Sequence, residues 1–136
     1  MWVNETSLQA WVPRMLSMLR IMAALLFLQY GLSKYFGFSA NPLPNFHMLS
    51  LIGLAGEIEP VGSLLLLVGL YSREAAFIMS GEIAAAYFMR HAPNGLFPQV
   101  NAGGLQVMFC FAFLFLFLAG PGPWSVDAVR RPTATI

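Results

Sequence analysis

Residues 53–70 read Gly-Leu-Ala-Gly-Glu-Ile-Glu-Pro-Val-Gly-Ser-Leu-Leu-Leu-Leu-Val-Gly-Leu. This stretch is apolar enough to lie in lipid, yet Glu57, Glu59 and Pro60 fall near its middle. A charged side chain near the bilayer centre costs roughly 2.5–3.5 kcal/mol on insertion scales, and a proline leaves one backbone carbonyl without its helical donor. We therefore expect these groups to find partners elsewhere in the protein.

The composition predicts an integral membrane protein with a single domain over residues 1–136. Of the 136 residues, 58% are hydrophobic and 10% are charged, whereas an average soluble domain is about 25% charged. The length fits about four membrane spans. A net charge of +1, with no basic patch, argues against a nucleic-acid partner.

Four apolar stretches predict an all-α protein, a four-transmembrane-helix bundle with up-down-up-down topology. The expected spans are residues 15–33, 46–70, 73–90 and 104–119. Residues 1–13, with Trp2 and Trp11, are expected to lie at the membrane interface, and Ser72 is the expected N-cap of the third helix.

The last expected span alternates phenylalanine with other residues from 109 to 117, which is typical of a strand. The intervening residues are apolar too, so neither face would be polar, and a helix is expected instead of a barrel strand. Basic residues near the two termini slightly outnumber those at the other end of the bundle. This bias predicts that both termini are cytoplasmic.

Three charged residues are expected to meet inside the membrane. Counted from the cytoplasmic helix ends at 1.5 Å per residue, Arg20, Glu82 and Glu59 lie about 9, 12 and 16 Å deep. A guanidinium group can pair with two carboxylates, so Arg20 is expected to reach Glu59, Glu82 or both. The direction of Glu57, about 200° around the helix from Glu59, is left open.

Two interpretations of these charges remain open. A buried Arg–Glu set can simply fix the register of the helices, or it can form a protonatable site beside a membrane-soluble ligand. His91 and Asn101 lie in a turn-rich loop after the third span. The two histidines are isolated and Cys110 is the single cysteine, so no metal, haem or nucleotide site is expected.

Several motifs, taken in order, resemble the DoxX family of small four-span bacterial membrane proteins. They are Arg20 with Gly31-Leu-Ser-Lys34, Glu59-Pro-Val-Gly-Ser-Leu-Leu-Leu-Leu-Val-Gly69, Ala86-Tyr-Phe-Met-Arg-His-Ala-Pro-Asn-Gly95 with Asn101-Ala-Gly103, and Gly120-Pro-Gly-Pro-Trp-Ser-Val-Asp127. The resemblance implies a four-helix bundle in the bacterial inner membrane. It also implies association with oxidoreductases, because the family takes its name from a subunit of a thiosulfate:quinone oxidoreductase.

The resemblance carries over six positions: Arg20, Lys34, Glu59, His91, Asn101 and Asp127. The chain departs from the family pattern at Gly104, where an acidic residue is usual after Asn-x-Gly. Any role of that acid is therefore not expected in this chain.

The favoured hypothesis is a quinone-linked redox component with a partner protein that supplies the redox centre, since haem, flavin and iron–sulfur motifs are missing from the sequence. The expected catalytic residues are Arg20, Glu59 and Glu82. The expected cofactor-binding residues are Tyr30, Lys34, Tyr87, His91 and Asn101, with Met89 as further lining. Whether the chain is itself an enzyme or forms a homo-oligomer is left open. A non-catalytic membrane anchor is the alternative, and a small-solute or proton carrier is less favoured.

Overall fold

The computed structural model describes residues 4–36 and 51–130, and the side chains of residues 4–32 and 58–130. Within these ranges the chain is helical and contains no strand. The long helices are α1 (Glu5–Phe36), α2 (Leu51–Val68), α3 (Ser72–Ala86) and α5 (Gly104–Ala119). The short ones are the π-helical turn η1 (Tyr87–His91), the 3-10 turn η2 (Ala92–Asn94), α4 (Pro98–Asn101) and α6 (Val126–Arg130).

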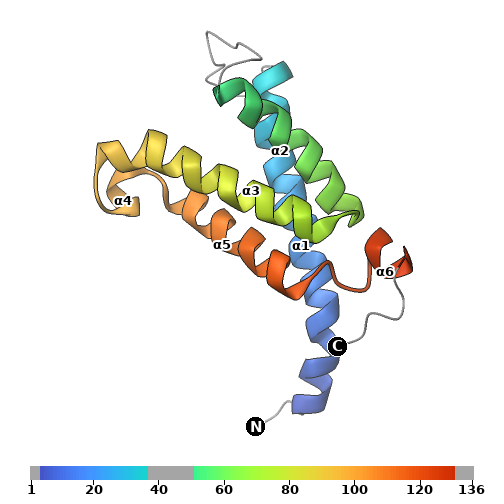
Figure 1. Ribbon diagram of the computed structural model, residues 1–136. Coiled ribbons are helices and arrows are strands. Elements are labelled where there is room, and N and C mark those ends of the chain that lie inside the picture. Colours follow the sequence, from blue (N-terminus) through green and yellow to red (C-terminus); the bar gives the residue numbers. More distant parts are fainter. Residues whose placement is uncertain (1–3, 37–50, 131–136) are drawn as a thin grey trace.

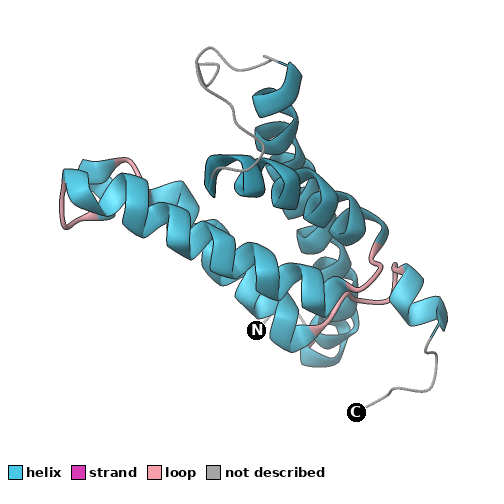
Figure 2. Cartoon of the chain, turned by 45° about the horizontal axis from the view of Figure 1, so that its top comes forward, coloured by secondary structure: helices cyan, strands magenta, loops and turns pink. Residues whose placement is uncertain are grey.

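The four long helices form two pairs. Helix α1 packs along α2, and α3 packs along α5, while α1 and α5 touch over a much smaller area. The α3–α5 pair leans away from the α1–α2 pair, and the two pairs meet near the turn that joins α2 to α3 (Figure 1). Figure 2 shows the same divergence from a second direction. The all-helical prediction is confirmed for the described residues, but an up-down-up-down bundle is not, because the two pairs diverge.

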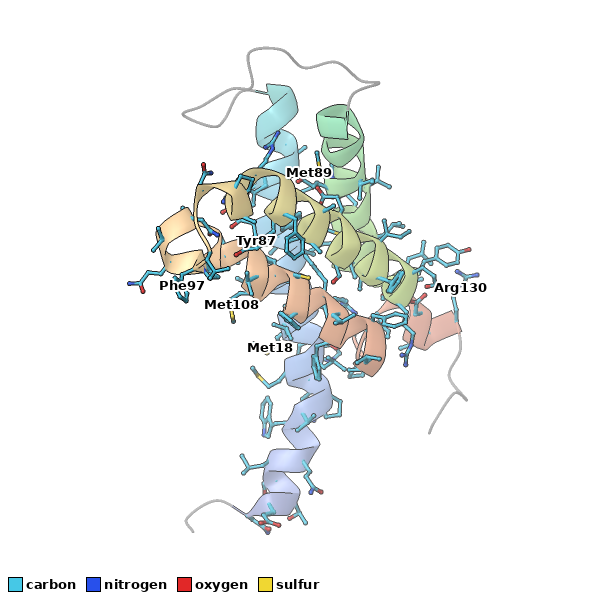
Figure 3. The ribbon with its side chains drawn as sticks, turned by 60° about the vertical axis from the view of Figure 1, so that its left-hand side comes forward. Met18, Tyr87, Met89, Phe97, Met108 and Arg130 are labelled. Carbon is cyan, nitrogen blue, oxygen red and sulfur yellow. The ribbon has the colours of Figure 1, made fainter. Side chains whose placement is uncertain are left out.

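Among the described residues, one helix has the length and composition of a membrane span, over Glu5–Leu32. Two further apolar helices, Ile58–Val68 and Gly104–Ala119, are shorter. Large apolar side chains cover the outer faces of these helices, and Figure 3 shows Met18 and Met108 among them. The expectation of four spans stays a prediction.

The observed helices differ from the predicted spans at the start of α1 and at the end of α3, where the π-helical turn η1 takes over at Tyr87, and the predicted start of the second span at residue 46 lies outside the described residues. Helix α5 covers the predicted residues 104–119, which confirms a helix in place of a strand. Helix α1 begins at Glu5 and continues through Pro13, so residues 5–13 belong to the same helix as the first span, and their place at the membrane interface stays a prediction. The N-terminal part of α1 extends beyond the other helices (Figure 1).

The apolar core lies where the two pairs meet. The ring of Phe27 on α1 packs edge-on against Phe109 and Phe113 of α5, with centroids 5.0 and 5.4 Å away. Such pairs are worth about 0.5–1.5 kcal/mol beyond the area that they bury. Around them lie the other buried apolar residues: Ala23, Ala24, Leu66, Ala75, Ala76, Met79, Ile83 and Leu116.

Candidate functional site

Arg20 holds the C-terminal loop against α1. Its side chain is 1% exposed, and its two terminal nitrogens donate hydrogen bonds of 2.6 Å to the backbone carbonyls of Pro121 and Trp124. The hydroxyl of Ser17, one turn earlier on α1, accepts a hydrogen bond from the Trp124 amide. The loop that follows α5 is therefore wrapped around one buried guanidinium group.

Asp127 connects the same loop to the start of α3. Its two carboxylate oxygens accept hydrogen bonds from the backbone amides of Tyr71 and Ser72, at 3.0 and 2.9 Å. Its own amide donates to the carbonyl of Gly69. The predicted N-cap, Ser72, is instead the first residue of α3. A negative charge at a helix N-terminus is favourable, so Asp127 caps α3 from a distant part of the chain.

Arg73 fixes the end of α5 to the same region. Its guanidinium group donates to the carbonyls of Phe117 and Leu118 in the last turn of α5. We call Arg20, Arg73, Asp127 and the loop 121–125 the terminal clamp. It joins the middle of α1 to the C-terminal ends of α2 and α5 and to the start of α3.

The predicted pairing of Arg20 with Glu59 or Glu82 was wrong. A Cβ built on Gly69 would lie 2.7 Å from Nη1 of Arg20, so Arg20 is level with the α2–α3 turn. Glu59 precedes Gly69 by ten residues, which is about 15 Å along a helix. The expectation failed because it took Arg14 as the end of the first span, whereas α1 continues well beyond Arg14 on the N-terminal side.

The two glutamates instead share a second level with Tyr30. Tyr30 follows Arg20 by ten residues, Glu59 precedes Gly69 by ten, and Glu82 follows Ser72 by ten. Each therefore lies about 15 Å from the terminal clamp. Packing supports this register, because a Cβ on Gly31 would lie 3.2 Å from Cβ of Glu59.

Burial differs among these three residues. Glu59 is 6% exposed and Glu82 is half-buried, while Tyr30 is 43% exposed. Each of the three side chains makes at least one interaction with another part of the folded chain. The Tyr30 ring meets that of Phe109 edge-on, with centroids 6.5 Å apart, which brings α5 to the same level.

Sequence reasoning missed Gln106, a fourth polar residue near this level. Gln106 lies one turn before Phe109, on the buried face of α5 that also carries Phe113 and Leu116. Its Oε1 atom is buried and accepts no hydrogen bond. The available signal was a lone amide side chain in an otherwise apolar helix. We call Tyr30, Glu59, Glu82 and Gln106 the acidic layer.

Tyr87, His91 and Asn101 meet at the far end of the α3–α5 pair. The side-chain amide of Asn101 donates to the Tyr87 hydroxyl at 3.1 Å and to the Gly95 carbonyl at 3.0 Å. The rings of Tyr87 and His91 stack, with centroids 6.0 Å apart. We call these three residues the loop cluster.

The tautomer of His91 follows from its hydrogen bond. Its Nδ1 lies 3.0 Å from the backbone carbonyl of Asn101. A carbonyl only accepts, so Nδ1 carries the proton and Nε2 is an acceptor when the ring is neutral. Tyr87 and His91 are the first and last residues of the π-helical turn η1, and such turns are frequent at functional sites.

The structure thus divides the expected site residues among three places. Arg20 belongs to the terminal clamp; Tyr30, Glu59 and Glu82 to the acidic layer; Tyr87, His91 and Asn101 to the loop cluster. Met89 is exposed and does not line a site. The side chains of Lys34 and Glu57 lie outside the described residues. Among the side chains that are described, no group of His, Cys, Asp and Glu could hold a metal ion.

Comparison with known proteins identifies the family. The family model for DoxX matches residues 15–92, more than half of the chain. An uncharacterized protein of Haemophilus influenzae is 36% identical over 126 residues, which cover 89% of this chain and 94% of that relative. No solved structure matches the chain. The chain therefore belongs to the DoxX family of membrane proteins.

Proposed function

We propose that this protein is a membrane component of a quinone-linked redox assembly, and that its acidic layer receives the polar head of a quinone. The observation that carries the proposal is the acidic layer itself. By their spacing from the terminal clamp, two carboxylates, a phenol and a buried amide lie near one level of the helices. Ionisable residues at membrane depth are costly, which favours a functional reason for them.

The residues of the acidic layer fit a quinone head in three respects. The unused Oε1 of Gln106 accepts a hydrogen bond from the hydroxyl of a reduced ring. The partly exposed ring of Tyr30 offers an aromatic surface for stacking. Because Tyr30 is also partly exposed on the outside of α1, a lipid-soluble molecule can approach from the bilayer.

Arg20 does not touch the ligand in this mechanism, because it lies about 15 Å away in the terminal clamp. A bound quinone would supply the redox chemistry, taking up electrons together with protons. Glu59 and Glu82 would hold and exchange those protons, since a carboxylate accepts a proton and a carboxylic acid donates one. The partner redox protein would supply the electrons.

The alternative function is a non-catalytic anchor or assembly subunit. One observation favours it: the outer face of α5 exposes large apolar side chains, including Met108, Phe111 and Leu118. Such a face suits lipid and also suits the apolar surface of another membrane subunit. An anchor would need the terminal clamp for stability but would have no use for the acidic layer.

Analysis of bound lipids separates the two functions. The protein is purified in mild detergent, and quinone in the extract is quantified by mass spectrometry per mole of folded protein. We expect stoichiometric quinone with the wild type, and a loss with Glu59→Gln and with Glu82→Gln.

Glu74→Gln is the matched control, because Glu74 is an exposed carboxylate in the first turn of the same helix as Glu82. It should retain quinone at the wild-type level. A wild type without quinone, but with a stable co-purifying membrane protein, would establish the anchor function instead. If Glu59→Gln and Glu82→Gln both retain quinone at the wild-type level, the acidic layer is not the quinone site.

A further inference from the structure

The tip of the α3–α5 pair exposes large apolar side chains, and the exposed side chains of Arg90 and Gln99 lie near them in the sequence. Leu96, Phe97 and Val100 are 84%, 66% and 70% exposed. Figure 3 shows Phe97 at this tip, away from the other long helices. Residues 92–126 contain no Asp, Glu, Lys or Arg. A loop in water would ordinarily carry charged or polar side chains at such positions.

The length of α5 also indicates that the tip of the α3–α5 pair ends inside the bilayer. Helix α5 has 16 residues, or about 24 Å at 1.5 Å per residue, whereas the hydrocarbon core of a bilayer is about 30 Å thick. The α3–α5 pair also leans over, so its tip ends short of the upper ends of α1 and α2 (Figure 1). With α1 crossing the membrane, the tip would remain inside it.

Asn101 satisfies the backbone of this loop from within. Its buried side chain donates to the Gly95 carbonyl and accepts from the Gly103 amide at 2.9 Å, while its own carbonyl accepts from His91. Non-helical backbone at membrane depth is tolerated only where its polar groups find partners inside the protein. The side chain of Asn101 meets this requirement for the Gly95 carbonyl and the Gly103 amide.

We propose that the loop of residues 95–103 is inserted into the lipid bilayer, with Leu96, Phe97 and Val100 in contact with acyl chains. The loop cluster then lies beneath this apolar tip, shielded from bulk water. This inference concerns the lipid surface and does not depend on the quinone proposal.

Spin labelling in reconstituted liposomes tests the insertion. In a Cys110→Ser background, single cysteines replace Leu96, Met108 and Arg130 in turn, and a nitroxide is attached to each. Met108 is the lipid-facing reference on α5, and Arg130 is the exposed, charged reference on α6. Power saturation then compares collisions with oxygen, which concentrates in lipid, and with a water-soluble nickel chelate.

We expect the ratio of oxygen to nickel accessibility at position 96 to match position 108 and to exceed position 130. Because the Leu96 side chain is almost fully exposed, its replacement should leave the fold intact. A ratio at position 96 equal to that at position 130 would place the loop in water and overturn the proposal. An immobilised label that neither reagent reaches would also overturn it, in favour of a protein partner on the tip.

Discussion

Replacing Arg20 by methionine tests whether this residue is structural or belongs to the ligand site. The change leaves the Pro121 and Trp124 carbonyls without their donors. A buried acceptor that loses its partner costs about 1–3 kcal/mol, and removing a buried charge returns part of that cost. We therefore expect Arg20→Met to lower the free energy of unfolding by roughly 2–4 kcal/mol.

The assay is reversible unfolding in mixed detergent and SDS micelles, followed by tryptophan fluorescence, since Trp124 lies in the clamp. Arg14→Met is the matched control on the same helix. Arg14 is exposed and its guanidinium carbon lies 4.8 Å from the centre of the Trp11 ring, a contact worth about 0.5–1 kcal/mol. Equal losses in the two variants would refute the clamp. If the Arg20→Met protein folds with wild-type stability but loses its bound quinone, Arg20 belongs to the ligand site and not to a structural clamp.

Three further changes test the packing around the site by the same unfolding measurement. Asp127→Asn removes one carboxylate acceptor from the start of α3 and should cost about 0.5–2 kcal/mol; an unchanged free energy would make the cap dispensable. Gly31→Ala places a Cβ 2.8 Å from a proline ring of α2 and should destabilise, whereas Gly81→Ala, whose Cβ meets nothing within 4 Å, should not; equal effects would contradict the close contact of α1 with α2. Asn101→Ala leaves the Gly95 carbonyl without its donor, while the Gly103 amide keeps the Pro98 carbonyl, and should cost roughly 1–3 kcal/mol; a smaller loss would mean that water replaces the amide.

The sequence predicts local features well because they depend on nearby residues. Helix α5 begins after Gly103 and ends at Gly120, as its apolar run and flanking glycines indicate. The start of α1 lies earlier than the predicted span because residues 5–13 mix polar and apolar side chains and give no continuous apolar run. A proline within a helix removes one hydrogen bond, which the surrounding turns tolerate here.

The site could be predicted only in part, because spacing within one helix does not set the register between two helices. The sequence singles out Glu59 and Glu82, yet Arg20 is level with Gly69 because of contacts made by residues more than a hundred positions later. Likewise, the cap that Asp127 provides for α3 joins residues 55 positions apart. No local pattern predicts such contacts.

The two interpretations of the buried charges concern different places in the molecule, and the ligand site at the acidic layer stays a proposal. Arg20 and Asp127 set the register, because the clamp joins the middle of α1 to the ends of the other three long helices. Glu59 and Glu82 lie about ten residues from the clamp along their helices. The register that the clamp sets brings them to the same level as Tyr30. A slip of one residue along α1 would shift Tyr30 by about 1.5 Å and turn it by about 100°. Arg20 would therefore act on any ligand of the acidic layer as a positioning residue, by holding α1 in register rather than by touching the ligand.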